Sequence, residues 1–283
     1  MSDPSGEGSS SSDEPLSGHR AGDSSERDPH PKIPRRRGIY LLPNLFTTAA
    51  LFSGFYAIVA ATDGRYESAA IAIFVAMVLD GVDGRIARMT GTQSNFGAEY
   101  DSLSDVISFG LAPSLLLYES VLAGMGKPGW VAAFFYTAAT ALRLARFNVQ
   151  VGSTDKRYFQ GLPCPAAAAV LAGLVWFVGD HDLLGPALAP FAFAITIATG
   201  ALMVSRFRFH SFKNLDLRGQ VPFSAIFAVV LLFVLVSSDP PLVLFLAALA
   251  YAGSGPLLTL LSLRRRRARR RGMSSSSYDI DPG

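Results

Sequence analysis

The stretch MVLDGVDGRIARMTGTQSNFGAEYDSLSDVISFG, residues 77–110, places four aspartates in a part of the chain that is otherwise apolar enough to be buried. Two are three residues apart and two are four apart, so each pair lies on one face of a helix. Carboxylates inside a membrane are costly unless they are paired, hydrated or bound to a cation. The stretch therefore predicts two facing carboxylate pairs that need a divalent cation, formed by Asp80, Asp83, Asp101 and Asp105.

The whole chain has the composition of a membrane protein. Of its 283 residues, 50% are hydrophobic and 17% are charged, and the mean hydropathy is +0.32. A helical span of a bilayer needs about 20 apolar residues. Five apolar runs fit or nearly fit this length, and three more fit it but carry Asp or Arg at one end. We expect an all-α integral membrane protein with about eight transmembrane helices, at 45–62, 68–90, 95–123, 128–147, 162–179, 183–204, 221–238 and 242–263.

The chain divides into four predicted parts by composition. Residues 1–38 are polar and predict a disordered cytoplasmic tail, and residues 264–283 predict a basic cytoplasmic tail. Residues 39–219 would form the catalytic core of six spans, and residues 220–263 two additional helices. The one cysteine, Cys164, excludes an internal disulfide.

Lysine and arginine predict the orientation, because cytoplasmic loops are enriched in them. With both termini in the cytoplasm, only Arg65 and Lys127 of the 25 lysines and arginines fall on the outer side. We therefore expect a multi-pass protein of the cell membrane with cytoplasmic termini and a site open to the cytoplasm. The basic run at 264–271 is typical of a flank beside a span that also attracts anionic lipid, and we expect no nucleic-acid partner.

The residues around the aspartates favour a metal-bound polyphosphate as ligand. Oxygen ligands without His or Cys favour Mg²⁺ or Mn²⁺ over Zn²⁺, with Ca²⁺ as a non-productive occupant. Gly81, Gly84 and Gly97 would let a bulky ligand approach the backbone, and Arg88 could meet a phosphate. Two divalent ions could neutralise a pyrophosphate while a free carboxylate oxygen takes a proton from an attacking hydroxyl. The alternatives are structural aspartates that cap helices or pair with Arg85 or Arg88, and the transit site of a cation transporter.

The spacing of these residues resembles the signature of the CDP-alcohol phosphatidyltransferase family, D-x2-D-G-x2-A-R-x8-G-x3-D-x3-D. Every fixed position matches, from Asp80 to Asp105. The resemblance implies transfer of a phosphatidyl group from a CDP-linked lipid to an alcohol, with release of CMP. It implies that the four aspartates hold two metals and that Asp105 is also the general base. It further implies contacts to the CDP-lipid from Gly81, Gly84, Ala87, Arg88, Ser94 and Gly97.

Less specific segments are similar to the phosphatidylserine synthase branch of this family, among them RLARFN at 143–148 and FQGLPCPAAA at 159–168. The resemblance implies CDP-diacylglycerol, or its ether-lipid equivalent, and L-serine as substrates, and a homodimer as the assembly. Cations could hold the carboxylate of serine, but equally the phosphate of glycerol 3-phosphate or inositol phosphate, so these acceptors stay open. The candidate acceptor residues are Arg143, Arg146, Asn148 and Lys213.

Overall fold

The computed structural model of the protein describes residues 41–92, 94–150, 158–205, 207–210 and 223–275. Its long helices are α1 (Leu41–Thr62), α2 (Tyr66–Thr90), α5 (Lys127–Gln150), α6 (Cys164–Asp180), α7 (Ala189–Val204), α8 (Phe223–Ser238) and α9 (Pro240–Ser275). A further continuous helical stretch comprises α3 (Asn95–Asp105), η2 (Val106–Leu111), α4 (Ala112–Leu117), η3 (Tyr118–Leu122) and η4 (Ala123–Met125). A short 3₁₀ turn, η5 (Pro186–Leu188), precedes α7.

The predicted all-α membrane fold is confirmed. The eight helical stretches coincide with the eight predicted spans, and four of them are long and apolar enough to cross a bilayer by themselves. Among the described residues, a small antiparallel pair of strands departs from the helical pattern, β1 (Tyr158–Gln160) with β2 (Arg208–His210). Helix α9 continues through the predicted boundary at 263, and the boundaries at 38 and 219 lie outside the described residues.

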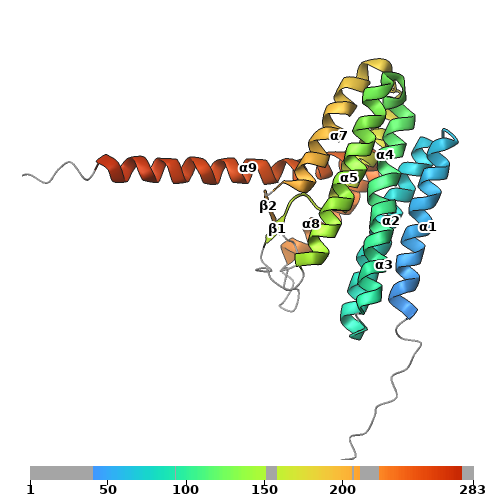
Figure 1. Cartoon of the computed structure of the whole chain (residues 1–283), viewed down its shortest axis with the longest axis horizontal. Coiled ribbons are helices and arrows are strands. Elements are labelled where there is room, and N and C mark those ends of the chain that lie inside the picture. The colour runs from blue at the N-terminus through green and yellow to red at the C-terminus, as the bar shows by residue number, and fades with distance from the viewer. Residues whose placement is uncertain (1–40, 93, 151–157, 206, 211–222, 276–283) are drawn as a thin grey trace, which may run out of the picture. The chain divides into compact units, whose positions relative to one another are not determined.

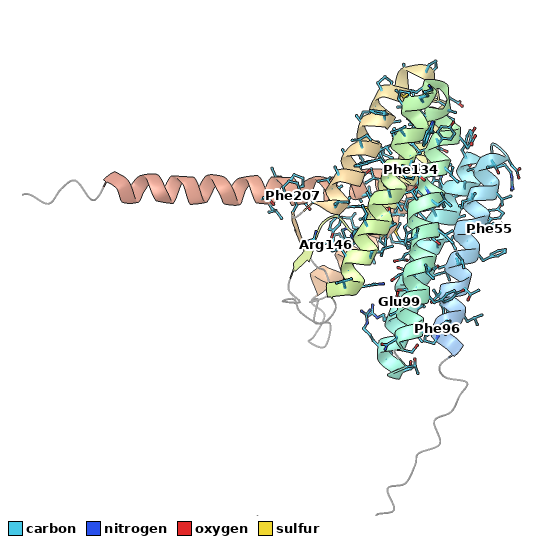
Figure 2. The ribbon with its side chains drawn as sticks, in the orientation of Figure 1. Phe55, Phe96, Glu99, Phe134, Arg146 and Phe207 are labelled. Atoms are coloured by element: carbon cyan, nitrogen blue, oxygen red, sulfur yellow. The ribbon has the colours of Figure 1, made fainter. Side chains whose placement is uncertain are left out.

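The outward surface of the helices is apolar, as a bilayer requires. Phe52 on α1 is 70% exposed and Phe134 on α5 is 63% exposed. Figure 2 shows the labelled Phe55 on the outer side of α1. Exposed apolar surface on this scale marks contact with lipid or protein rather than with water.

Small residues bring α1, α2 and the α3–η2 segment into close contact, and this packing positions the aspartates. The Ser53 hydroxyl donates to the Ala72 carbonyl at 2.7 Å, joining α1 to α2. The Ser108 hydroxyl donates to the Ala50 carbonyl at 3.2 Å, joining η2 to α1. At Gly54 a Cβ atom would lie 2.7 Å from the Ser108 Cα, so this crossing excludes a side chain. These three segments lie side by side in Figure 1.

A π-helical turn, η2, begins directly after Asp105. Such turns inside α-helices are rare and occur frequently at functional sites. The buried Tyr136 of α5 donates its hydroxyl to the Phe109 carbonyl within this turn, at 3.1 Å. Thr137 lies within 3.5 Å of the Gly110 carbonyl. Helix α5 therefore stabilises the irregular turn on the side that faces the core.

Candidate functional site

Three of the four predicted carboxylates meet, one from α2 and two from α3, and both of these helices pack against α1. One oxygen each from Asp80, Asp101 and Asp105 lies within 4.8 Å of the other two. The carboxyl of Asp80 interacts electrostatically with those of Asp101 and Asp105. The helical spacing predicted the shared face of Asp101 and Asp105, and the structure adds that Asp80 of α2 lies close to this pair.

The fourth aspartate, Asp83, is held by a residue that the sequence analysis missed. The Thr47 hydroxyl of α1 donates to Asp83 Oδ2 at 2.8 Å, and both side chains are buried. Asp83 interacts electrostatically with the other three carboxylates but does not belong to the three-residue cluster. The signal available in the sequence was the pair Thr47-Thr48, two polar residues near the start of an apolar run.

The cluster has the features of a cation site. Asp101 Oδ1 is buried and has no hydrogen-bond partner among the described residues. A buried carboxylate oxygen without a partner is costly, and neighbouring carboxylates repel each other unless a proton or cation lies between them. The donors are all carboxylate oxygens, which hard divalent cations prefer. Asp80, Asp101 and Asp105 could therefore hold a metal ion.

The residues predicted to contact the CDP-lipid lie on α2 and at the start of α3, in two different environments. A Cβ atom at Gly81 or Gly84 would meet nothing within 4 Å, so α2 is open beside the carboxylates. Ser94 instead caps α3, because its hydroxyl accepts from the Gly97 N–H at 3.0 Å. This cap is a structural role that the sequence analysis did not consider. Ala87 is half-buried and Arg88 is exposed on the last turn of α2.

The candidate acceptor residues on α5 differ in their surroundings. Arg143 Nη1 donates to the buried thiol of Cys164 at 3.0 Å, and Arg143 Nε is buried with no hydrogen-bond partner among the described residues. The Asn148 amide contacts Ser102 at 3.1 Å and Glu99 at 3.3 Å, and so joins α5 to α3 next to Asp101. Arg146 is half-buried. Figure 2 labels Glu99 on α3 and Arg146 on α5, and Lys213 lies outside the described residues.

Comparisons with known proteins agree with this geometry. A family model described as CDP-alcohol phosphatidyltransferase matches residues 40–203, more than half of the chain, including the four aspartates of the predicted metal site. A CDP-diacylglycerol–serine O-phosphatidyltransferase from Helicobacter pylori is 38% identical over 176 residues, covering 62% of this chain and 74% of that protein.

Two further relatives extend the comparison. A protein of the same name from Mycobacterium tuberculosis is 41% identical over 147 residues, covering 50% of this chain and 51% of its own. An archaetidylserine synthase from Methanothermobacter thermautotrophicus is 35% identical over 166 residues, covering 58% of this chain and 67% of that protein. The family match spans the helices that build the carboxylate cluster. The chain therefore belongs to the CDP-alcohol phosphatidyltransferase family.

Proposed function

We propose that the protein transfers a phosphatidyl group from CDP-diacylglycerol, or an ether-lipid equivalent, to L-serine and releases CMP. The observation that carries this proposal is the meeting of Asp80, Asp101 and Asp105 within a family-matched core. The choice of serine is supported by two bacterial relatives named CDP-diacylglycerol–serine O-phosphatidyltransferase and an archaeal relative named archaetidylserine synthase.

In this proposal Asp105 is the general base. A serine hydroxyl does not ionise unaided near neutral pH, so a carboxylate within reach of it must accept the proton as the oxygen attacks. The serine oxygen forms a bond to the lipid-side phosphorus of CDP-diacylglycerol, and the bond from that phosphorus to the oxygen of CMP breaks. The bonding electrons leave with CMP. Asp105 directly precedes the π-helical turn η2, a type of irregularity that occurs frequently at functional sites.

The four aspartates would together hold two divalent cations, Mg²⁺ or Mn²⁺, with Ca²⁺ binding non-productively. Bound cations would neutralise the pyrophosphate and the charge that develops on the departing CMP. Asp80 and Asp83 would approach this position from α2, and Asp101 and Asp105 from α3. The open backbone at Gly81 and Gly84 gives the nucleotide diphosphate room beside them, with Ala87, Arg88, Ser94 and Gly97 completing the CDP-lipid position.

Thr47 orients Asp83 through the hydrogen bond from α1. Replacing Thr47 by valine keeps the volume and removes the donor, and loss of an outer partner of a metal ligand weakens metal binding by about 10–100-fold. We expect Thr47→Val to raise the Mn²⁺ concentration needed for half-maximal activity by about tenfold. Thr48→Val is the matched control, because the Thr48 hydroxyl hydrogen-bonds to the Asn44 carbonyl and to the Tyr100 hydroxyl and not to an aspartate. An unchanged Mn²⁺ dependence in Thr47→Val would refute this role.

We also propose that the site and both termini face the cytoplasm of the cell membrane, and that the protein is a homodimer. The distribution of charge supports the orientation. Arg88 lies at the same end of α2 as the aspartates, whereas Arg65 precedes the opposite end of that helix. Arg65 pairs there with Asp63 at 3.0 Å and contacts Tyr56, an aromatic residue suited to a membrane interface.

A panel of acceptors tests the proposed reaction. Purified protein with Mg²⁺ or Mn²⁺ and CDP-diacylglycerol is given L-serine, glycerol 3-phosphate or inositol phosphate, and CMP and the lipid product are measured. We expect CMP release and a serine phospholipid with L-serine alone. Product with glycerol 3-phosphate and none with serine would contradict the proposal that serine is the acceptor, but would still support phosphatidyl transfer. No product with any acceptor, together with cation flux into vesicles, would favour a transporter.

A further inference from the structure

We infer that Asn148 of α5 is a positioning residue for the metal site, because it holds α3 so that Asp101 lies where the cation binds. This inference rests on the proposed metal-dependent transfer. It gives Asn148 a task other than the contact to the acceptor that the sequence predicts, and it names the residues of α3 through which that task is performed.

The side-chain amide of Asn148 is occupied by two residues of α3. Its Nδ2 donates to Ser102 Oγ at 3.1 Å and to Glu99 Oε2 at 3.3 Å. An amide NH₂ group has two N–H donors, so both are used. Its Oδ1 lies 3.3 Å from the Ser102 hydroxyl. Asn148 therefore has no N–H left for an acceptor molecule, and its contacts join α5 to α3.

Helix α1 holds a second face of α3. The Ser104 hydroxyl donates to the Thr47 carbonyl at 3.3 Å, and Ser104 is buried. The hydroxyl of the same Thr47 donates to Asp83 of α2 at 2.8 Å. Thr47 therefore positions α3 relative to α2, and Asn148 holds α3 from α5.

The carboxylates of α3 lie between these two faces. Successive residues of a helix are about 100° apart around its axis, which places Asp101 and Asp105 between Ser104 on one side and Ser102 on the other. Ser102 directly follows Asp101, so a shift of α3 at Ser102 also moves Asp101.

Asp105 depends less on Asn148 than Asp101 does. It directly precedes η2, which α5 holds separately through the hydrogen bond from the Tyr136 hydroxyl to the Phe109 carbonyl. Loss of the Asn148 contacts should therefore weaken metal binding at Asp101 while the proposed base stays in place.

The test measures Mn²⁺ binding to Asn148→Leu, which keeps nearly the same volume and removes both N–H donors. Electron paramagnetic resonance of free Mn²⁺ gives the Kd without turnover. We expect the Kd to rise about fivefold, less than the 10–100-fold found when a residue bonded to the metal ligand itself is lost. The Mn²⁺ concentration for half-maximal activity should rise by the same factor. At saturating Mn²⁺ the activity should recover, and KM for L-serine should not rise.

A compensating pair tests the contact between Asn148 and Glu99 directly. Asn148→Asp combined with Glu99→Gln keeps the net charge and exchanges donor and acceptor, because the new amide can donate to the new carboxylate. The carboxylate can also accept from the Ser102 hydroxyl, which already lies 3.3 Å from Oδ1. We expect this double variant to bind Mn²⁺ more tightly than Asn148→Leu does.

Ser102→Ala tests the other contact, and Ser120→Ala is its matched control. Ser102→Ala should also raise the Kd for Mn²⁺, and its effect should be less than additive with Asn148→Leu, because both remove the same hydrogen bond. The Ser120 hydroxyl donates to the Leu117 carbonyl in the same helical stretch, about 22 Å along the helix from Asp105. Ser120→Ala should leave Mn²⁺ binding unchanged.

Thermal unfolding in detergent shows which variants fold, and the comparison of Ser102→Ala with Ser120→Ala decides if Asn148→Leu does not. Unchanged Mn²⁺ binding in the folded variants would overturn the inference. A raised KM for L-serine with unchanged Mn²⁺ binding would also overturn it and would make Asn148 a ligand of the acceptor. Absence of Mn²⁺ binding in the unaltered protein would instead overturn the proposed metal-dependent transfer.

Discussion

Asp105→Asn should lower kcat for phosphatidyl transfer by at least about 1,000-fold, within the range that a positioned general base contributes. Asparagine has nearly the same shape and can still offer an oxygen, but its amide cannot accept the proton of the acceptor hydroxyl. The measurement is CMP release at saturating CDP-diacylglycerol and acceptor, repeated at increasing Mn²⁺. If Asp105 is the base, the loss in kcat persists at the highest Mn²⁺ concentration.

The control for this variant is Asp180→Asn, at the exposed end of α6 away from Cys164. It removes one carboxylate of the same type and should leave kcat unchanged. Recovery of full activity in Asp105→Asn at high Mn²⁺ would show that Asp105 is a metal ligand and not the base. If Asp105→Asn is as active as the unaltered protein at every Mn²⁺ concentration, Asp105 has no role in the mechanism.

Asp101→Asn should have the second large effect, and its effect should be on metal binding. One oxygen of Asp101 is buried without a hydrogen-bond partner among the described residues, as expected of an oxygen that coordinates a cation. Loss of a residue that hydrogen-bonds to a metal ligand weakens metal binding by about 10–100-fold. Loss of the ligand itself should therefore lower the affinity for the metal by at least about 100-fold. The Mn²⁺ concentration for half-maximal activity measures this directly, and electron paramagnetic resonance of free Mn²⁺ measures it without turnover.

The two aspartate variants thus separate two roles. In Asp101→Asn, kcat should recover substantially when Mn²⁺ is raised, whereas in Asp105→Asn it should not. A chelator should inactivate the unaltered protein, and Mg²⁺ or Mn²⁺ should restore it. Unchanged Mn²⁺ binding in Asp101→Asn would contradict the assignment of the cluster as a metal site and would favour a structural role for the unpaired oxygen.

The shared faces of the aspartates could be predicted from the sequence because helical geometry alone determines them. Asp101 and Asp105 are four residues apart, and the structure indeed brings both to Asp80. The partner of Asp83 could not be predicted, because it depends on how α1 is rotated against α2. That rotation follows from close contacts such as Ser53 with Ala72, which join residues far apart in the chain.

The contacts of the candidate acceptor residues could not be predicted either, because they also join residues far apart in the chain. The segment RLARFN predicted a group of polar side chains near the site, but its residues could not be told apart by composition. In the structure, Asn148 joins α5 to α3 through Ser102 and Glu99, while Arg143 reaches Cys164 on α6.

The π-helical turn at Val106–Leu111 has a consequence for how this span could have arisen. A π turn accommodates one more residue than an α turn, and one residue corresponds to a rotation of about 100° around a helix axis. The segment before the turn can therefore aim Asp105 at the other carboxylates, while Leu116 and Leu117 after it still enter the core. Insertion of a single residue into an ancestral regular helix would suffice to give the two halves of one span separate orientations.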